Sequence, residues 1–133
     1  MKKKFVDTNI FIYSLFPVDK DKCNRCNILF ENAARGKILL WTSEWIIAEL
    51  IWFLQREKTR VESCKEIILK ILSTKGLEVK NKNWLLNILD MWDGKADFVD
   101  VVGVYESGIE GIREGYSYDK DFDNLPDFTR LEP

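Results

Sequence analysis

Histidine is absent from this 133-residue chain, and cysteine and proline occur only three times each. The lack of histidine excludes Ser-His-Asp and Cys-His nucleophilic catalysis and removes imidazole as a general base. Three cysteines are too few for a disulfide framework, and the lone C-x-x-C pair of Cys23 and Cys26 cannot complete a tetrahedral zinc site. We interpret these two residues as ordinary thiols. Any chemistry must therefore use carboxylates, hydroxyls, lysines or a metal.

Long apolar runs are also missing, since no stretch of about 18 apolar residues occurs. Asp7 and Asn9 interrupt the N-terminal segment in which apolar residues follow three lysines, and no small-residue cleavage pattern comes after it, so we expect a cytoplasmic protein without membrane contact. The length predicts a single domain over residues 1–133. A net charge of −2 argues against generic electrostatic binding of nucleic acid, but not against a nuclease whose own carboxylates make the count acidic.

Short apolar segments alternate with helical patterns along the chain. The predicted strands are residues 3–7, 37–41, 77–79, 116–119 and 128–131. The predicted helices are a first one beginning at residues 8–9, then 19–35, 44–57, 61–73, 83–92 and 96–107, with N-cap hydroxyls for the third offered by Thr42 and Ser43. This alternation predicts an α/β fold with a parallel sheet and helices on both faces.

Three acidic residues stand alone within apolar segments. Asp7 follows the first predicted strand, where open parallel sheets place their ligands. Glu49 is the only charge from Trp45 to Leu54, in a helix so apolar that the helix should be buried, and Asp100 is flanked by valines with Asp97 one turn before it. Each acid alone is explained as a helix cap, a lysine partner or a residue that reaches solvent. Together they are explained most simply if they converge on one divalent cation with oxygen ligands.

A further acidic segment begins at Asp119 and continues through Asp121. It fails as an EF-hand calcium loop because Asn124 and Arg130 stand where glycine and glutamate are required. Two interpretations stay open: a solvated turn, or an acid delivered from a strand end to the cluster that contains Asp7.

Several other residues carry a weaker signal. Thr8 and Asn9 could position a water or serve as N-cap residues. Among the tryptophans, we expect Trp45 and Trp52 in the core, and we favour the core over a partner surface for Trp84 and Trp92.

Four segments, in this order, resemble the PIN domain family and, within it, the small VapC-like ribonuclease toxins of toxin-antitoxin pairs. They are the opening strand with its Asp-Thr-Asn signature at Asp7-Thr8-Asn9, the helix with Glu49, the segment with Asp100 and its accessory Asp97, and a closing Thr-x-Asp-x-Asp-Phe element in which Ser117 replaces threonine and Asp119 and Asp121 supply the acids.

The resemblance implies a PIN-like, Rossmann-like three-layer fold with a parallel sheet of four to five short strands. It implies that Asp7, Glu49, Asp100 and Asp119 hold Mg2+ or Mn2+ and hydrolyse RNA phosphodiester bonds, with Thr8, Asn9, Asp97, Ser117 and Asp121 as accessory residues. It also implies a homodimer and a cognate antitoxin as partners.

Two other functions remain as alternatives. A non-catalytic PIN-type module would bind RNA or a protein partner and keep its acids for structure. A phosphoacceptor signalling domain also clusters acids at strand ends. It requires a lysine on a late strand, and no such strand is evident in this sequence; it also leaves Glu49 without a role.

Overall fold

The computed structural model describes residues 2–133, which alternate between strands and helices. The elements are β1 (Lys3–Phe5), α1 (Thr8–Leu15), α2 (Lys20–Ala34), β2 (Leu39–Thr42), α3 (Glu44–Arg56), α4 (Val61–Leu72), β3 (Leu77–Val79), α5 (Lys82–Met91), α6 (Phe98–Ile109), β4 (Glu114–Tyr116), the short 3-10 helix η1 (Lys120–Asn124) and β5 (Thr129–Leu131). The α/β fold with parallel strands is confirmed. Within the described residues, no helix combines the length and apolar character needed to cross a membrane.

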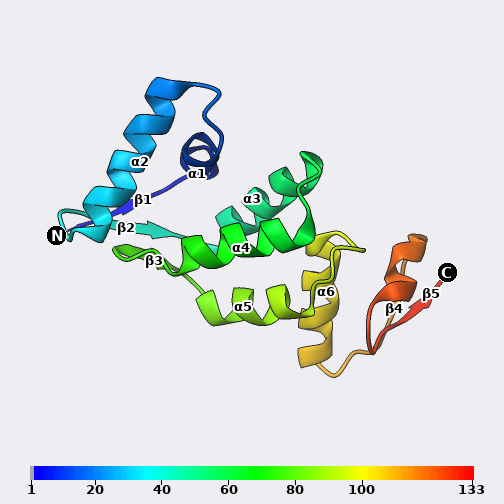
Figure 1. Cartoon of the computed structure of the whole chain (residues 1–133). Coiled ribbons are helices and arrows are strands. Elements are labelled where there is room, and N and C mark those ends of the chain that lie inside the picture. The colour runs from blue at the N-terminus through cyan, green and yellow to red at the C-terminus, as the bar shows by residue number, and fades with distance from the viewer. Residues whose placement is uncertain (1) are drawn as a thin grey trace.

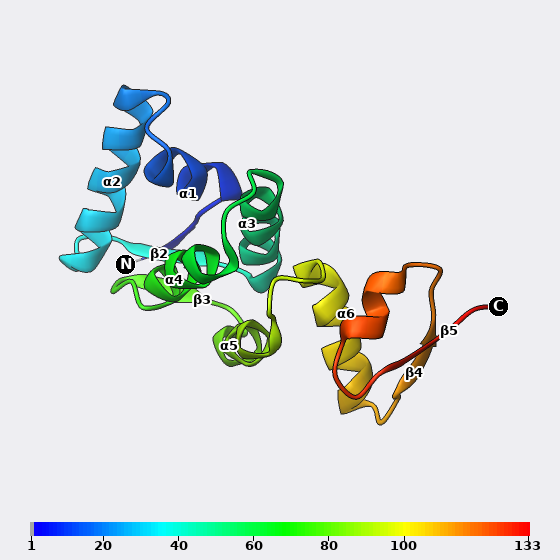
Figure 2. The same cartoon turned by 45° about the vertical axis from the view of Figure 1, so that its right-hand side comes forward.

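The first sheet contains three parallel strands in the order β1-β2-β3. Lys3 is aligned with Leu39, and Leu40 with Leu77. In both ribbon views α1 and α2 lie on one side of these strands and α5 lies on the other (Figures 1 and 2). The prediction of helices on both sides of a parallel sheet is therefore confirmed.

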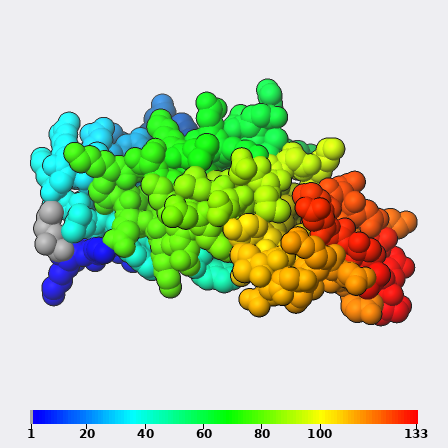
Figure 3. Space-filling view, turned by 90° about the horizontal axis from the view of Figure 1, so that it is seen from below, coloured from blue at the N-terminus to red at the C-terminus, as the bar shows by residue number. Residues whose placement is uncertain are grey.

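The last two strands form a separate sheet, in which β4 pairs with β5 in parallel. The predicted single sheet of four to five strands is therefore divided into three strands and two. Figures 1 and 2 place β4 and β5 at the opposite end of the molecule from β1, with α6 between, and the space-filling view shows the same separation (Figure 3). The physical reason is local packing. Leu125, next to η1, joins the buried cluster that includes Val101 and Val104 of α6, and contacts close in sequence cost less chain entropy than distant ones.

Helix α3 is the centre of the core. Ile47, Leu50, Ile51 and Leu54 are completely buried. Their spacing places them on one side of the helix, which packs against α1, α4 and α6. The burial of each such side chain contributes about 1.5–3 kcal/mol to folding.

The start of α3 differs from the expected capping pattern. Ser43 occupies the N-cap position, but its hydroxyl makes no capping hydrogen bond. Thr42 is buried instead, and its Oγ1 donates to the carbonyl oxygen of Val6 at 2.9 Å. This bond ties the end of β2 to the end of β1, just before Asp7.

Gly76 provides a sharp test of the packing between α2 and β3. Its φ is +84°, and a Cβ there would lie 2.1 Å from the carbonyl oxygen of Ala33. We expect Gly76→Ala to lower the free energy of unfolding by roughly 2–4 kcal/mol, because both a strained backbone and a steric clash are introduced. Gly36 is the matched control, since its φ is +76° but nothing lies within 4 Å of the added carbon.

The control variant Gly36→Ala should lose about 1–2 kcal/mol, from backbone strain alone. Urea denaturation, monitored by tryptophan fluorescence, measures the free energy of unfolding of both variants. Equal losses in the two variants would contradict the proposed contact with Ala33.

Candidate active site

The first group of predicted site residues lies where β1 leads into α1. Asp7 is exposed at the N-cap position of α1, and its carboxylate makes no capping hydrogen bond. Thr8 is buried, and its hydroxyl donates to Glu49 Oε2 at 3.0 Å. Asn9 follows on the first turn and is exposed. The structure therefore brings Glu49 to the residue next to Asp7, across 41 positions of sequence.

The second group lies where α6 begins and faces η1. Asp97 is the N-cap residue of α6, and Asp100 is in its first turn. Asp119 is the N-cap residue of η1, where its Oδ1 accepts the backbone N–H of Asp121 at 2.9 Å. Ser117 Oγ accepts the N–H of Asp119 at 3.0 Å. The carboxylate of Asp119 thus caps η1, in addition to the metal-binding role that the sequence predicts for it.

The acids of this second group act on one another. Partial burial raises the pKa of Asp100 above its ordinary value, and repulsion from Asp97, Asp119 and Asp121 raises it further. The N-terminus of α6 favours a negative charge at this place, but the other effects outweigh it. Mutual repulsion among neighbouring carboxylates is typical of a site that accepts positive charge.

The raised pKa of Asp100 predicts how stability changes with pH. Because the charged form is disfavoured in the folded protein, this residue's contribution to stability falls as pH rises from the unfolded value of 3.8 through the folded pKa. We expect Asp100→Asn to raise the free energy of unfolding at pH 7 and to leave it nearly unchanged at pH 3, where the carboxyl group is protonated in both states. Denaturation at pH 3, 5 and 7 measures this difference.

A control for general charge removal is Asp90→Asn, since Asp90 is exposed on α5. This variant should change stability by less than about 0.5 kcal/mol at any of these pH values. If Asp100→Asn lowered stability at pH 7 while leaving it unchanged at pH 3, the repulsion within the second group would be refuted.

The two groups are separate within one chain. The acids that act on Asp100 are Asp97, Asp119 and Asp121, and neither Asp7 nor Glu49 is among them. In residues 2–133, no three acidic or cysteine side chains lie close enough together to hold a metal ion. The oxygen donors suit Mg2+ or Mn2+ chemically, but their arrangement in a single chain does not fit such an ion.

Glu49 lies on an exposed stripe of α3. Trp45 and Trp52, four residues before it and three after it, are 71% and 47% exposed. The prediction that both are core residues is wrong, and so is the expectation that Glu49 is buried. The guanidinium of Arg56 stacks over the Trp52 ring, 4.6 Å from its centre. The spacing 45-49-52-56 could have revealed this stripe, because it places two polar residues on the same helix face as the tryptophans.

The cysteines have the environment of structural thiols. Burial raises the pKa of Cys64 to about 11. Burial and the neighbouring Cys23 raise the pKa of Cys26. Reactive thiols have lowered pKa values, so these two groups are poor nucleophiles.

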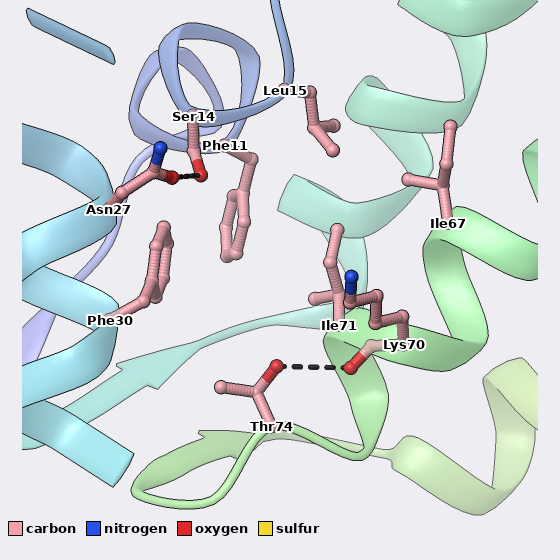
Figure 4. Close-up of a pocket in the computed structure, with 9 residues that line it drawn as sticks. All are labelled: Phe11, Ser14, Leu15, Asn27, Phe30, Ile67, Lys70, Ile71 and Thr74. Carbon is pink, nitrogen blue, oxygen red and sulfur yellow. Dashed lines mark hydrogen bonds between the residues drawn. The ribbon is translucent and has the colours of Figure 1, made fainter. Parts of the chain in front are cut away.

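A pocket of about 350 Å³ lies away from both acidic groups (Figure 4). It is lined from α1, α2, α4 and the residues after α4, with Phe11 and Phe30 stacked at 5.4 Å, and none of the predicted acids lines it. Lys70 supplies the single charged side chain of the lining. This mostly apolar pocket suits an apolar ligand better than a phosphodiester.

Comparison with known proteins gives a likeness to solved structures. No family model and no curated protein matches the chain. Among solved structures, it is similar to the crystal structure of VapBC2 from Rickettsia felis bound to a DNA fragment from their promoter, with 13% identity, 98% of each chain covered and a TM-score of 0.40. The α/β architecture is compatible with a PIN-like fold.

Proposed function

We propose that this protein is a ribonuclease of the PIN type that hydrolyses RNA phosphodiester bonds, with Asp7, Glu49, Asp100 and Asp119 as its site. One observation carries the proposal: the Thr8 hydroxyl holds the Glu49 carboxylate beside Asp7, at the carboxyl end of β1. Two acids predicted from distant parts of the sequence are thus linked through Thr8, at the edge where parallel sheets bind ligands.

The surroundings of Glu49 support single-stranded RNA as the substrate class. Trp45 and Trp52 flank the glutamate on the exposed face of α3. Exposed aromatic rings stack on unpaired bases, with about 1–3 kcal/mol for each base, and every base offers a face for such stacking. Arg56 over Trp52 adds a positive charge at the end of the same stripe for a phosphate.

We propose Mg2+ or Mn2+ as the cofactor, because both ions prefer carboxylate oxygens. The four acids do not meet in one chain, so the complete site requires a rearrangement or a second chain. As further parts of this proposal, the protein acts in the cytoplasm as the toxin of a toxin-antitoxin pair, is inhibited by a cognate antitoxin and forms a homodimer.

The division of the acids into two groups favours one alternative, the non-catalytic PIN-type module. In that case Asp119 serves as the cap of η1 and Glu49 as the acceptor for Thr8, with no reaction at either place. Such a module would bind RNA without cleaving it.

Cleavage of a mixed single-stranded RNA pool by the purified protein tests the proposal. We expect cleavage with Mn2+ and with Mg2+, and a rate at least about a hundred-fold lower in EDTA, since divalent ions supply several kcal/mol in such reactions. Undiminished cleavage in EDTA would refute the metal dependence. RNA binding without cleavage, together with no calorimetric binding of millimolar Mn2+, would favour the non-catalytic module.

A further inference from the structure

Two strands of this chain each have an unpaired edge. Within the described residues, β1 pairs only with β2, and β4 pairs only with β5. Phe5 at the end of β1 is 59% exposed, and Tyr116 at the end of β4 is 72% exposed. Parallel strands are normally buried inside larger sheets, and open edges with exposed apolar side chains are sites of strand addition.

The segment β4-η1-β5 is organised as a unit of its own. Arg130 connects its parts, donating from Nε to Asp123 at 2.9 Å and from Nη1 to the Ser117 carbonyl at 3.0 Å. A sheet of two strands is marginal by itself in water. The edge of β4 therefore gains stability from any strand that adds to it.

Within one chain, β1 lies far from the open edge of β4, and α6 lies between the two strands (Figures 1 and 2). The backbone N–H of Phe98, at the start of α6, donates to Gln55 Oε1 of α3 at 3.2 Å. The buried Phe98 ring packs edge-on against Trp92, with ring centres 5.5 Å apart. Movement of β4 to its own β1 would break this packing, whereas a second copy can supply the missing strand without any such loss.

Charge favours this association as well. Residues 94–133 contain 10 acidic and 4 basic side chains, whereas residues 1–93 contain 12 acidic and 16 basic ones. Lys4 lies on β1, where the neighbouring Lys3 is paired with Glu78 of β3, and Glu114 begins β4. The C-terminal and N-terminal parts of the chain therefore carry net charges of opposite sign, which steers one copy's C-terminal segment toward another copy's N-terminal part.

We infer that β4 of one copy adds in parallel to β1 of a second copy, so that Asp7 and Glu49 of one chain meet Asp100 and Asp119 of the other. The combined sheet has the order β3-β2-β1-β4-β5, in which β1 and β4 flank the place where the strand order reverses. Ligands of doubly wound sheets bind there, beyond the carboxyl ends of the strands. Asp7 follows β1 and Asp119 follows β4 at that end. The shared site rests on the proposed function, while the strand pairing does not.

Disulfide trapping tests the pairing without any activity. Neighbouring strands lie about 4.8 Å apart, within the range that a disulfide spans. The test variant carries Phe5→Cys and Tyr116→Cys in one chain, together with Cys23→Ser. On mild oxidation we expect it to form a disulfide-linked dimer, seen as a product of twice the chain mass that a reductant converts back to the single chain. The control is Phe5→Cys with Val18→Cys, because Val18 is 94% exposed in the loop after α1.

The control should remain a single chain. A disulfide within one chain in the test variant would show that the strand comes from the same copy, and this would overturn the inference. Equal amounts of the doubled product in test and control would also overturn it, since random collision would then explain both.

Complementation tests the shared site. Asp7→Asn and Asp119→Asn are each expected to be inactive, but a refolded equal mixture should recover about a quarter of wild-type cleavage, because half of the dimers are mixed and each mixed dimer has one intact site. No recovery with an active wild type would overturn the shared site. An inactive wild type that still gives the doubled disulfide product would refute the proposed function and leave the strand pairing established.

Discussion

Asp7→Ala is expected to lower the rate of RNA cleavage roughly a hundred- to a thousand-fold while changing the free energy of unfolding by less than about 0.5 kcal/mol. The activity should fall because Asp7 lies beside the Thr8–Glu49 pair at the carboxyl end of β1. The fold should tolerate the change because the Asp7 side chain is exposed and makes no capping hydrogen bond. Single-turnover cleavage and urea denaturation give the two quantities.

Asp19 offers a matched control, because it is also the N-cap residue of a helix, α2, but does cap it. Its Oδ1 accepts the backbone N–H of Lys22 at 3.0 Å. Asp19→Ala should therefore lose about 1 kcal/mol of stability and retain full cleavage. Asp7→Ala is thus expected to lose cleavage but keep its stability, whereas Asp19→Ala is expected to lose stability but keep its cleavage. Equal cleavage rates for Asp7→Ala and the wild type would refute the placement of the active site.

The helices and strands were largely predictable because their signals are local. The predicted helix at 61–73 corresponds to α4, and the predicted strand at 77–79 is β3. Gly36 and Gly76 both adopt positive φ where the preceding helix has ended. Apolar spacing and glycine act within a few residues, so a single sequence displays them.

The division of the sheet was not predictable, because strand pairing joins distant segments. β4 was predicted two residues late, and the tendency of its short sequence to form a strand says nothing about its neighbour. In the structure β4 pairs with β5, and Leu125 between η1 and β5 belongs to the same buried cluster as Val101 and Val104 of α6. The same limitation explains why Asp119 was expected beside Asp7, whereas within one chain it lies with Asp100.

The exposed stripe of α3 shows a second limitation. A helix with apolar residues all round is expected to be buried, yet Trp45 and Trp52 face solvent. Hydrophobicity alone does not distinguish a buried tryptophan from one that stacks on a ligand. Asp7 and Glu49 are exposed and Asp100 is partly buried, so none of the three lies in the core, and exposure to solvent is one of the interpretations that the sequence left open.

Trp92→Ala is expected to be among the most destabilising changes in the chain, with a loss of roughly 3–5 kcal/mol in the free energy of unfolding. Trp92 is buried after α5, and its Nε1 donates to the carbonyl oxygen of Ala96 at 2.8 Å. Its ring also packs against Phe98, the first residue of α6. The side chain therefore fixes the turn that leads into the helix carrying Asp100, and urea denaturation measures what it contributes.

Two control variants separate the causes of that loss. Trp92→Phe keeps most of the packing but removes the hydrogen bond, so a loss of about 1–3 kcal/mol isolates the unpaired carbonyl of Ala96. Trp45→Ala removes the same indole from an exposed position and should cost less than about 0.5 kcal/mol. If Trp45→Ala were as destabilising as Trp92→Ala, Trp45 would be part of the core and could not stack on RNA bases. A large loss in the free energy of unfolding for Trp92→Ala but not for Trp45→Ala would agree with an exposed Trp45 that can stack on RNA bases. It would also agree with the role of Trp92 in positioning α6.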